Sequence, residues 1–273
     1  MKIKTLLYTT AAGLLTLASC DTVSENDRYI YVEEAEVQRC VLLEDFTGQQ
    51  CPNCPNAAVE TNKLQESYPN SVIAVAIHGG PLSPNTPVSL KSHVGDLYYS
   101  AAGQPKLPAG QIDRLGGTSV PEQWMGNVHT AIQRKAAVAL SIENDYDADG
   151  NKAAIKIKAY GMNAASGKLQ VWLVEDSIKA IQAMPDGSSN REYIHNHVLR
   201  AAVNGTWGED ISIAKGSEKT VTYTADLNPK TYMPNTRQTW NVANMHVVAF
   251  VYNDNGVQGV TKAALISNAE NSH

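Results

Sequence analysis

Two cysteines three positions apart, Cys51 and Cys54, are the residues of this sequence best suited to chemistry. The two intervening residues let a disulfide close within one helical turn, and a helix N-terminus stabilises a thiolate through its unpaired N–H groups and its dipole. The thiolate is the nucleophile in thiol–disulfide exchange. The spacing therefore predicts Cys51 as the attacking thiol and Cys54 as the resolving thiol, and we expect no cofactor.

The residues around this pair predict a strand, a turn, a helix and a second strand. Residues 37–46 are rich in β-formers, and residues 56–68 have apolar side chains at helical spacing. Residues 71–77 are apolar after Ser71, which is typical of a buried strand. This order is that of the first βαβ unit of a thioredoxin-like fold, which we expect for an α/β domain over residues 36–136.

Two further residues support this interpretation. Asp45 lies six positions before Cys51 and matches the buried acid beneath the dithiol of thioredoxins, where a carboxylate can accept the proton of the resolving thiol. Pro108 precedes an expected strand and resembles the proline, usually cis, that faces the dithiol in this fold. We therefore expect both residues in the site. An inserted loop at residues 79–93 explains the long segment between Cys51 and Pro108.

The cysteine pair has two other interpretations. A lone CxxC is half of a zinc site, but the sequence has no second CxxC and no Cys-x-x-His pair, so we expect no metal. A purely structural disulfide is common in exported proteins and stays open as an alternative. Cys40 is a further thiol, either free and buried in a strand or exchanging with the pair.

The N-terminus resembles a bacterial lipoprotein signal. Lys2 and Lys4 precede an apolar stretch that is too short to span a bilayer, and the string LASC ends at Cys20. In that pattern the cysteine is acylated, so its lipid anchors the mature protein to the membrane. We expect residues 1–19 to be the signal peptide and residues 20–35 a flexible tether. An ordinary signal peptide with an incidental cysteine is the alternative.

Length and composition exclude several classes of protein. The chain has 273 residues, of which 43% are hydrophobic and 18% charged, so wholesale disorder and a coiled-coil rod are ruled out. It has 22 basic against 27 acidic residues and no long basic run, so nucleic acid is not an expected partner. Four cysteines are too few for a disulfide-stapled miniprotein, and the chain must depend on apolar cores.

Beyond residue 136 the spacing of apolar residues changes to a period of two, which is typical of β-strands. Asp-Gly at 149–150 and Asn-Gly at 255–256 predict hairpin turns. We therefore expect residues 137–273 to form an all-β, sandwich-like C-terminal domain. The connection over residues 176–218 has no regular pattern and is expected to be irregular.

Two histidines in this connection are candidate binding residues. His195 and His197 lie on one side of an extended segment, which is compatible with a metal site, but a third ligand is not evident. Hydrogen-bonded loop anchors are the favoured interpretation. Arg200 lies close by, and the three residues would also suit a contact surface.

Four strings together resemble the twenty-eight-kilodalton outer-membrane lipoprotein family of Gram-negative bacteria: VLLEDFTGQQCPNCP at 41–55, VIAVAIHG at 72–79, PAGQIDR at 108–114 and YIHNHVLR at 193–200. The resemblance implies a lipid-anchored thioredoxin-like domain followed by a β-domain. It also implies an outer-membrane location on the periplasmic or cell-surface face. Members of the family are often surface-exposed and are suspected as adhesins or receptors.

Two functions follow from these observations. In the first, the protein is a thiol–disulfide oxidoreductase whose partners are the thiols and disulfides of exported proteins. In the second, it is a surface-exposed binding lipoprotein of adhesin or receptor type, in which the Cys51–Cys54 disulfide is structural and the partner is an unidentified surface ligand. Both functions include contact with the membrane through the lipid anchor.

Overall fold

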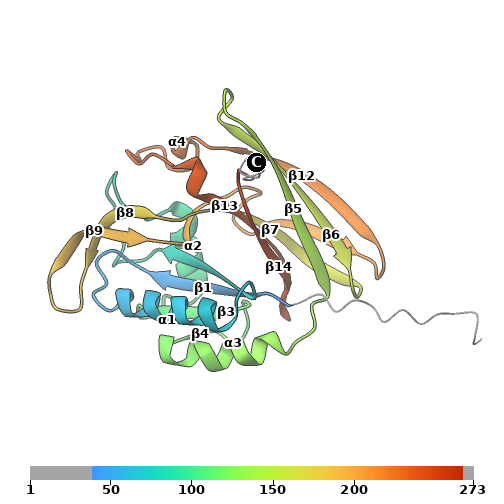
Figure 1. The fold of residues 1–273 in the computed structure, drawn as a ribbon, viewed down its shortest axis with the longest axis horizontal. Coiled ribbons are helices and arrows are strands. Elements are labelled where there is room, and N and C mark those ends of the chain that lie inside the picture. The colour runs from blue at the N-terminus through green and yellow to red at the C-terminus, as the bar shows by residue number, and fades with distance from the viewer. Residues whose placement is uncertain (1–38, 267–273) are drawn as a thin grey trace, which may run out of the picture. The chain divides into compact units, whose positions relative to one another are not determined.

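The computed structural model describes residues 39–266, and these residues lie within one compact unit (Figure 1). The predicted signal peptide and tether, with Cys20, lie outside the described residues. Within residues 39–266, no helix is long and apolar enough to cross a membrane.

Two parallel strands form the centre of the largest sheet. β1 (Val41–Thr47) pairs with β2 (Val72–His78), and α1 (Cys54–Ser67) connects them. All of β1 and nearly all of β2 is buried, as expected for parallel strands that are covered on both faces. The predicted order of strand, turn, helix and strand is therefore confirmed, with the ends of the elements shifted by one or a few residues.

The sheet continues on both sides of this pair. β3 (Ala109–Ile112) pairs antiparallel with β1 and carries β4 (Thr118–Ser119) at the edge. The strands beyond β2 are β10 (Val198–Ala202), β7 (Ala165–Glu175), β13 (Met245–Asn253) and β14 (Gly256–Ala264), and β11 (Glu209–Ile213) also pairs with β7. The sheet thus takes strands from both sides of the predicted domain boundary after residue 136, and that boundary stays a prediction.

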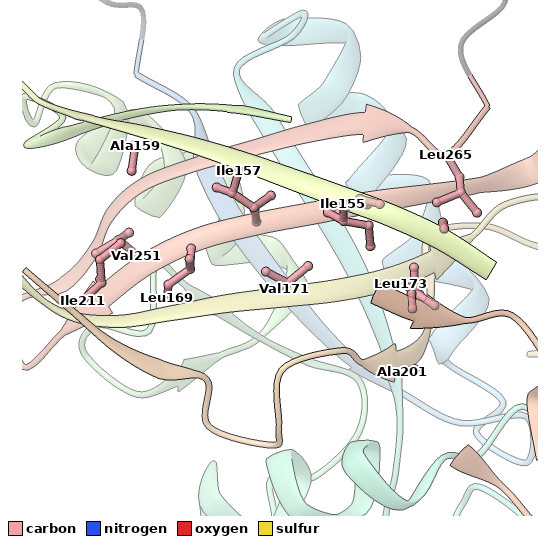
Figure 2. Close-up of a cluster of buried hydrophobic side chains, with 14 of the residues drawn as sticks. Ile155, Ile157, Ala159, Leu169, Val171, Leu173, Ala201, Ile211, Val251 and Leu265 are labelled. Atoms are coloured by element: carbon pink, nitrogen blue, oxygen red, sulfur yellow. The ribbon is translucent and has the colours of Figure 1, made fainter. Parts of the chain in front are cut away.

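A second sheet packs on the far end of the first. It consists of β5 (Val138–Asp147), β6 (Lys152–Gly161) and β12 (Glu218–Asp226). Ile155 and Ile157 of β6 share one buried cluster with Leu169, Val171 and Leu173 of β7 (Figure 2). Each such aliphatic side chain contributes about 1.5–3 kcal/mol on burial. The sandwich-like arrangement is therefore confirmed, as are the hairpins predicted at residues 149–150 and 255–256.

Helices cover both faces of the central strands. Side chains alternate between the two faces of a strand, so Val41 and Leu43 pack with α1 and with α3 (Trp124–Ile132), whereas Leu42 and Phe46 lie on the side of α2 (His93–Ala101). The turn η2 (Pro121–Gln123) leads into α3, and α4 (Pro229–Tyr232) and η3 (Val242–Asn244) precede β13.

The prediction of an irregular connection over residues 176–218 was wrong. The segment contains β10, β11 and an antiparallel hairpin of β8 (Ile178–Ala183) and β9 (Ser189–His195). β8 and β9 pair only with each other within the described chain, so much of the hairpin is solvated and several of its outer residues are polar. This composition hid the apolar alternation by which a half-buried strand is recognised.

Candidate functional site

Cys51 and Cys54 form a disulfide whose Cα atoms are 5.4 Å apart. Cys54 is the first residue of α1, and Pro55 follows it in the first turn. Proline is tolerated there because the N–H groups of the first turn make no hydrogen bond within the helix. Cys51 lies in the turn between β1 and α1, and its N–H group donates to the Gly48 carbonyl at 3.0 Å. The pair therefore lies at a helix N-terminus, in the environment that the spacing predicted.

The β8–β9 hairpin covers the disulfide. Gln182 of β8 donates its side-chain N–H groups to the carbonyl oxygens of Cys51 at 2.9 Å and Gly48 at 3.3 Å. The N–H group of Ala183 donates to the Gln49 carbonyl at 2.8 Å. As a result, the two cysteines are only 1% and 4% exposed. We therefore expect the hairpin to limit the access of another protein's thiol to either sulfur.

Asp45 lies near the end of β1 with its side chain on the α1 face. It is buried, and within residues 39–266 its Oδ1 atom has no hydrogen-bond partner. Burial raises the pKa of Asp45 from 3.8 to about 7, because the charged carboxylate loses its hydration. The carboxyl group can therefore gain and lose a proton near neutral pH.

Asp45 and Cys54 line one cavity of about 100 Å³ together with two histidines, His78 and His195. His78 is the last residue of β2 and His195 the last residue of β9, and their ring centroids are 5.4 Å apart in a T-shaped arrangement. The cavity lies at the carboxyl ends of β1 and β2, the edge at which open α/β sheets bind ligands. Three ionisable side chains that are distant in sequence, Asp45, His78 and His195, thus meet beside the disulfide.

Both of these histidines are buried and uncharged at neutral pH. Burial is the main cause that lowers the pKa of His195 to about 4. Burial also lowers the pKa of His78 well below 6.5. Repulsion from the Arg200 charge, and from His195 when that ring is protonated, lowers it further. His78 Nδ1 and His195 Nε2 have no hydrogen-bond partner in the part of the chain that the structure describes. Each ring therefore has a buried polar nitrogen without a partner, on a residue that lines the cavity.

The other two candidate binding residues are held by carboxylates. His197 lines the cavity, and its Nδ1 atom lies 2.9 Å from Asp176 Oδ1. Arg200 is 1% exposed, and its Nε atom lies 3.1 Å from Glu175 Oε2. The structure thus brings His195 and His197 to the disulfide, whereas Arg200 lies in a buried ion pair on β10.

The Leu107–Pro108 peptide bond is cis, as predicted. Pro108 precedes β3, and the register pairs Ala109 with Phe46 near the carboxyl end of β1. Leu107 belongs to the same buried apolar cluster as the two cysteines. Pro108 therefore lies at the end of β1 from which the cysteine turn leaves, and its contact with a substrate stays a prediction.

The third cysteine of residues 39–266 does not line the cavity. Cys40 is a free, half-buried cysteine that immediately precedes β1, and its Sγ atom lies 3.2 Å from the Asn70 carbonyl oxygen. Burial raises the pKa of the Cys40 thiol, which lowers its thiolate fraction and its reactivity.

Sequence reasoning missed two residues of the site, His78 and Gln182. His78 ends an otherwise apolar strand, and a polar residue at the carboxyl end of a buried parallel strand is a signal for a site. Gln182 carried no such signal, because its position depends on the folding of residues 178–195 over the cysteine turn. No group of three or more His, Cys, Asp or Glu residues within 39–266 is arranged to hold a metal ion.

The chain is similar to a known family and to solved structures. A family model described as outer membrane protein Omp28 matches residues 95–269. HBP35 of Porphyromonas gingivalis has a TM-score of 0.67 at 16% identity, over 85% of this chain and 77% of that one. The crystal structure of a protein from Agrobacterium tumefaciens has a TM-score of 0.51 at 15% identity, over 88% of this chain and 100% of that one. No curated protein matches significantly. At these identities the structural likeness shows the fold alone.

Proposed function

The chain belongs to the outer-membrane protein Omp28 family, and we propose that it exchanges thiols and disulfides with exported proteins through Cys51 and Cys54. The observation that carries the proposal is the buried Asp45 carboxyl, whose Oδ1 atom has no partner within residues 39–266 and which lines the same cavity as Cys54. Exchange needs a group that takes up and returns a proton near neutral pH, and Asp45, with a pKa of about 7, meets that need.

The order of elements supports a thioredoxin-like domain around this pair. Parallel β1 and β2 are joined through the CxxC turn and α1, and a cis-proline leads into antiparallel β3. We infer that residues 36–136 are such a domain and that Pro108 forms one wall of its substrate groove. The outer-membrane location follows from the family, and we infer that an acylated Cys20 provides the anchor.

In the proposed reaction, a thiolate of an exported protein attacks the Cys51 sulfur. The disulfide bond breaks, its electron pair passes to the Cys54 sulfur, and that sulfur takes the proton of Asp45. A second thiolate of the partner then attacks the partner sulfur that is bound to Cys51. Cys51 leaves as a thiolate and the partner closes a disulfide. The partner loses two electrons and the cysteine pair gains them, and the reverse sequence reduces a partner disulfide.

Reduction of insulin by the full chain, with dithiothreitol as the electron source, tests the proposal. We expect Cys51→Ser to abolish the catalysed reaction, because the serine oxygen cannot form the mixed disulfide. Cys40→Ser is the matched control, since Cys40 lies outside the cavity, and it is expected to keep wild-type activity. Equal activities of the wild type and Cys51→Ser would contradict exchange at this pair.

The burial of the disulfide favours a second candidate function. In it the pair is a structural disulfide beneath the β8–β9 hairpin, and the β-rich half binds a surface ligand. The reduction potential separates the two functions. A value below about −300 mV is typical of structural disulfides, whereas a value near about −200 mV is in the range of exchange proteins.

A further inference from the structure

We propose that His78 and His195, with water held in their cavity, carry protons between Asp45 and the solvent during exchange. The inference rests on the proposed exchange function and adds two residues to its site. These residues act through Asp45 rather than on sulfur, so they are positioning residues for the proton.

The cavity is suited to hold water. Its volume of about 100 Å³ is large enough for water, because a cavity of roughly 10–15 Å³ already holds one molecule. Asp45 Oδ1, His78 Nδ1 and His195 Nε2 are buried at the residues that line it, and none has a partner within residues 39–266. Buried polar atoms in native proteins nearly always have a hydrogen-bond partner, and water is the smallest molecule that supplies one.

The cavity also reaches the protein surface. Tyr193 and His195 lie on the same face of β9, because alternate residues of a strand point the same way, and their ring centroids are 4.8 Å apart. The cavity wall includes the exposed residues Asn62 and Asn196. The cavity that reaches the surface thus has Asp45 and both imidazoles in its wall, as a proton path from the carboxyl to the solvent requires.

Imidazole suits a relay because one ring nitrogen accepts a proton while the other donates one. The ring must return to neutral after each transfer, and the burial that lowers both histidine pKa values favours this return. The ionisable groups around the relay come from several elements. They are Asp45 on β1, Cys54 on α1, His78 on β2, Tyr193 and His195 on β9, His197 with Asp176, and Arg200 on β10.

The proton balance of the exchange defines the task of the relay. Two partner thiols release two protons to water as they form a disulfide, and the reduced cysteine pair takes up two. Cys54 takes its proton from Asp45, and the relay returns one solvent proton to the carboxylate. Cys51 takes the other proton from the solvent once the partner has left.

The test is the oxidation of the reduced full chain by glutathione disulfide, followed by stopped flow from pH 5 to 9. We expect His195→Gln and His78→Gln to slow the reaction at pH 7 by about tenfold or more, the size of a modest proton-transfer contribution. Added imidazole is expected to restore part of the rate, because it replaces the lost proton carrier. His93→Gln is the control, since His93 is exposed on α2 and lies outside this cavity.

A structural role of the histidines predicts different results. A rate that is lost in both variants and does not respond to imidazole overturns the relay, as does a wild-type rate in both variants. Equal wild-type rates in light and heavy water also overturn it, and this measurement needs no variant. Failure of the wild-type pair itself to react with glutathione at any pH contradicts the exchange function as well. The two failures are therefore distinguishable.

Discussion

At the scale of single residues, Asp45 makes the stability of the oxidised protein depend on pH. Its folded pKa of about 7 lies above its ordinary value of 3.8, so between these pH values the native state holds a proton that the unfolded chain has released. Stability therefore falls as the pH rises through this window. The difference between the two pKa values corresponds to at most about 4 kcal/mol of folding stability.

Asp45→Asn removes this dependence, because an amide does not ionise. Compared with the wild type, we expect the variant to gain in free energy of unfolding from pH 4 to pH 8, by about 2–4 kcal/mol. Urea unfolding of both oxidised proteins at the two pH values measures the difference. A difference that stays constant between pH 4 and pH 8 would show that Asp45 titrates normally.

At the scale of elements, the β8–β9 hairpin controls access to the disulfide. Gln182 fixes it to the cysteine turn through two carbonyl oxygens, and loss of hydrogen bonds to buried groups costs about 1–3 kcal/mol. We expect Gln182→Ala to raise the rate of disulfide reduction by dithiothreitol about tenfold, which corresponds to about 1.4 kcal/mol of easier opening.

Lys179→Ala is the matched control on the same hairpin. Lys179 and Glu192 are both exposed and their charged atoms lie 2.6 Å apart, and a surface ion pair of this kind contributes little. We expect the control to be reduced at the wild-type rate. Equal rates for the two variants would mean that the hairpin does not limit access to the sulfurs.

The helices and strands that could be predicted are those that have signals in the neighbouring sequence. Prolines and Gly-containing turns bound the βαβ unit, and Asp-Gly and Asn-Gly pairs mark two hairpins that the structure contains. α2 was missed because it follows the proline-containing segment that was expected to be a loop, and its cap by Ser92 is a weak signal. β8 and β9 were missed because they are partly solvated and carry polar residues on their outer face.

At the scale of the whole molecule, one sheet joins the two predicted halves. β10 lies between β2 and β7, and the N–H group of Ala76 donates to the His197 carbonyl at 2.7 Å. The cysteine pair, Asp45 and Pro108 were predictable because a motif within about 65 residues contains them. His195 was singled out, but its place beside Asp45 was not predictable, since the two residues are 150 positions apart and no local pattern connects them.

In the proposed function, an acylated Cys20 holds the protein at the outer membrane. We expect Cys20→Ala to move the protein from the membrane pellet to the soluble fraction, because acyl chains hold a protein firmly in a bilayer and alanine cannot carry them. Fractionation of cells that express each form measures the change, and Cys40→Ala is the control. An unchanged pellet fraction for Cys20→Ala would contradict lipid anchoring.

The position of the hairpin far along the chain has a consequence for biosynthesis. A polypeptide that emerges N-terminus first delivers Cys51 and Cys54 more than a hundred residues before the strands that will shelter them. While the rest of the chain is still being translocated, the hairpin cannot yet shield either sulfur from an oxidant. The β8–β9 hairpin can then close over a disulfide that formed before these strands were made.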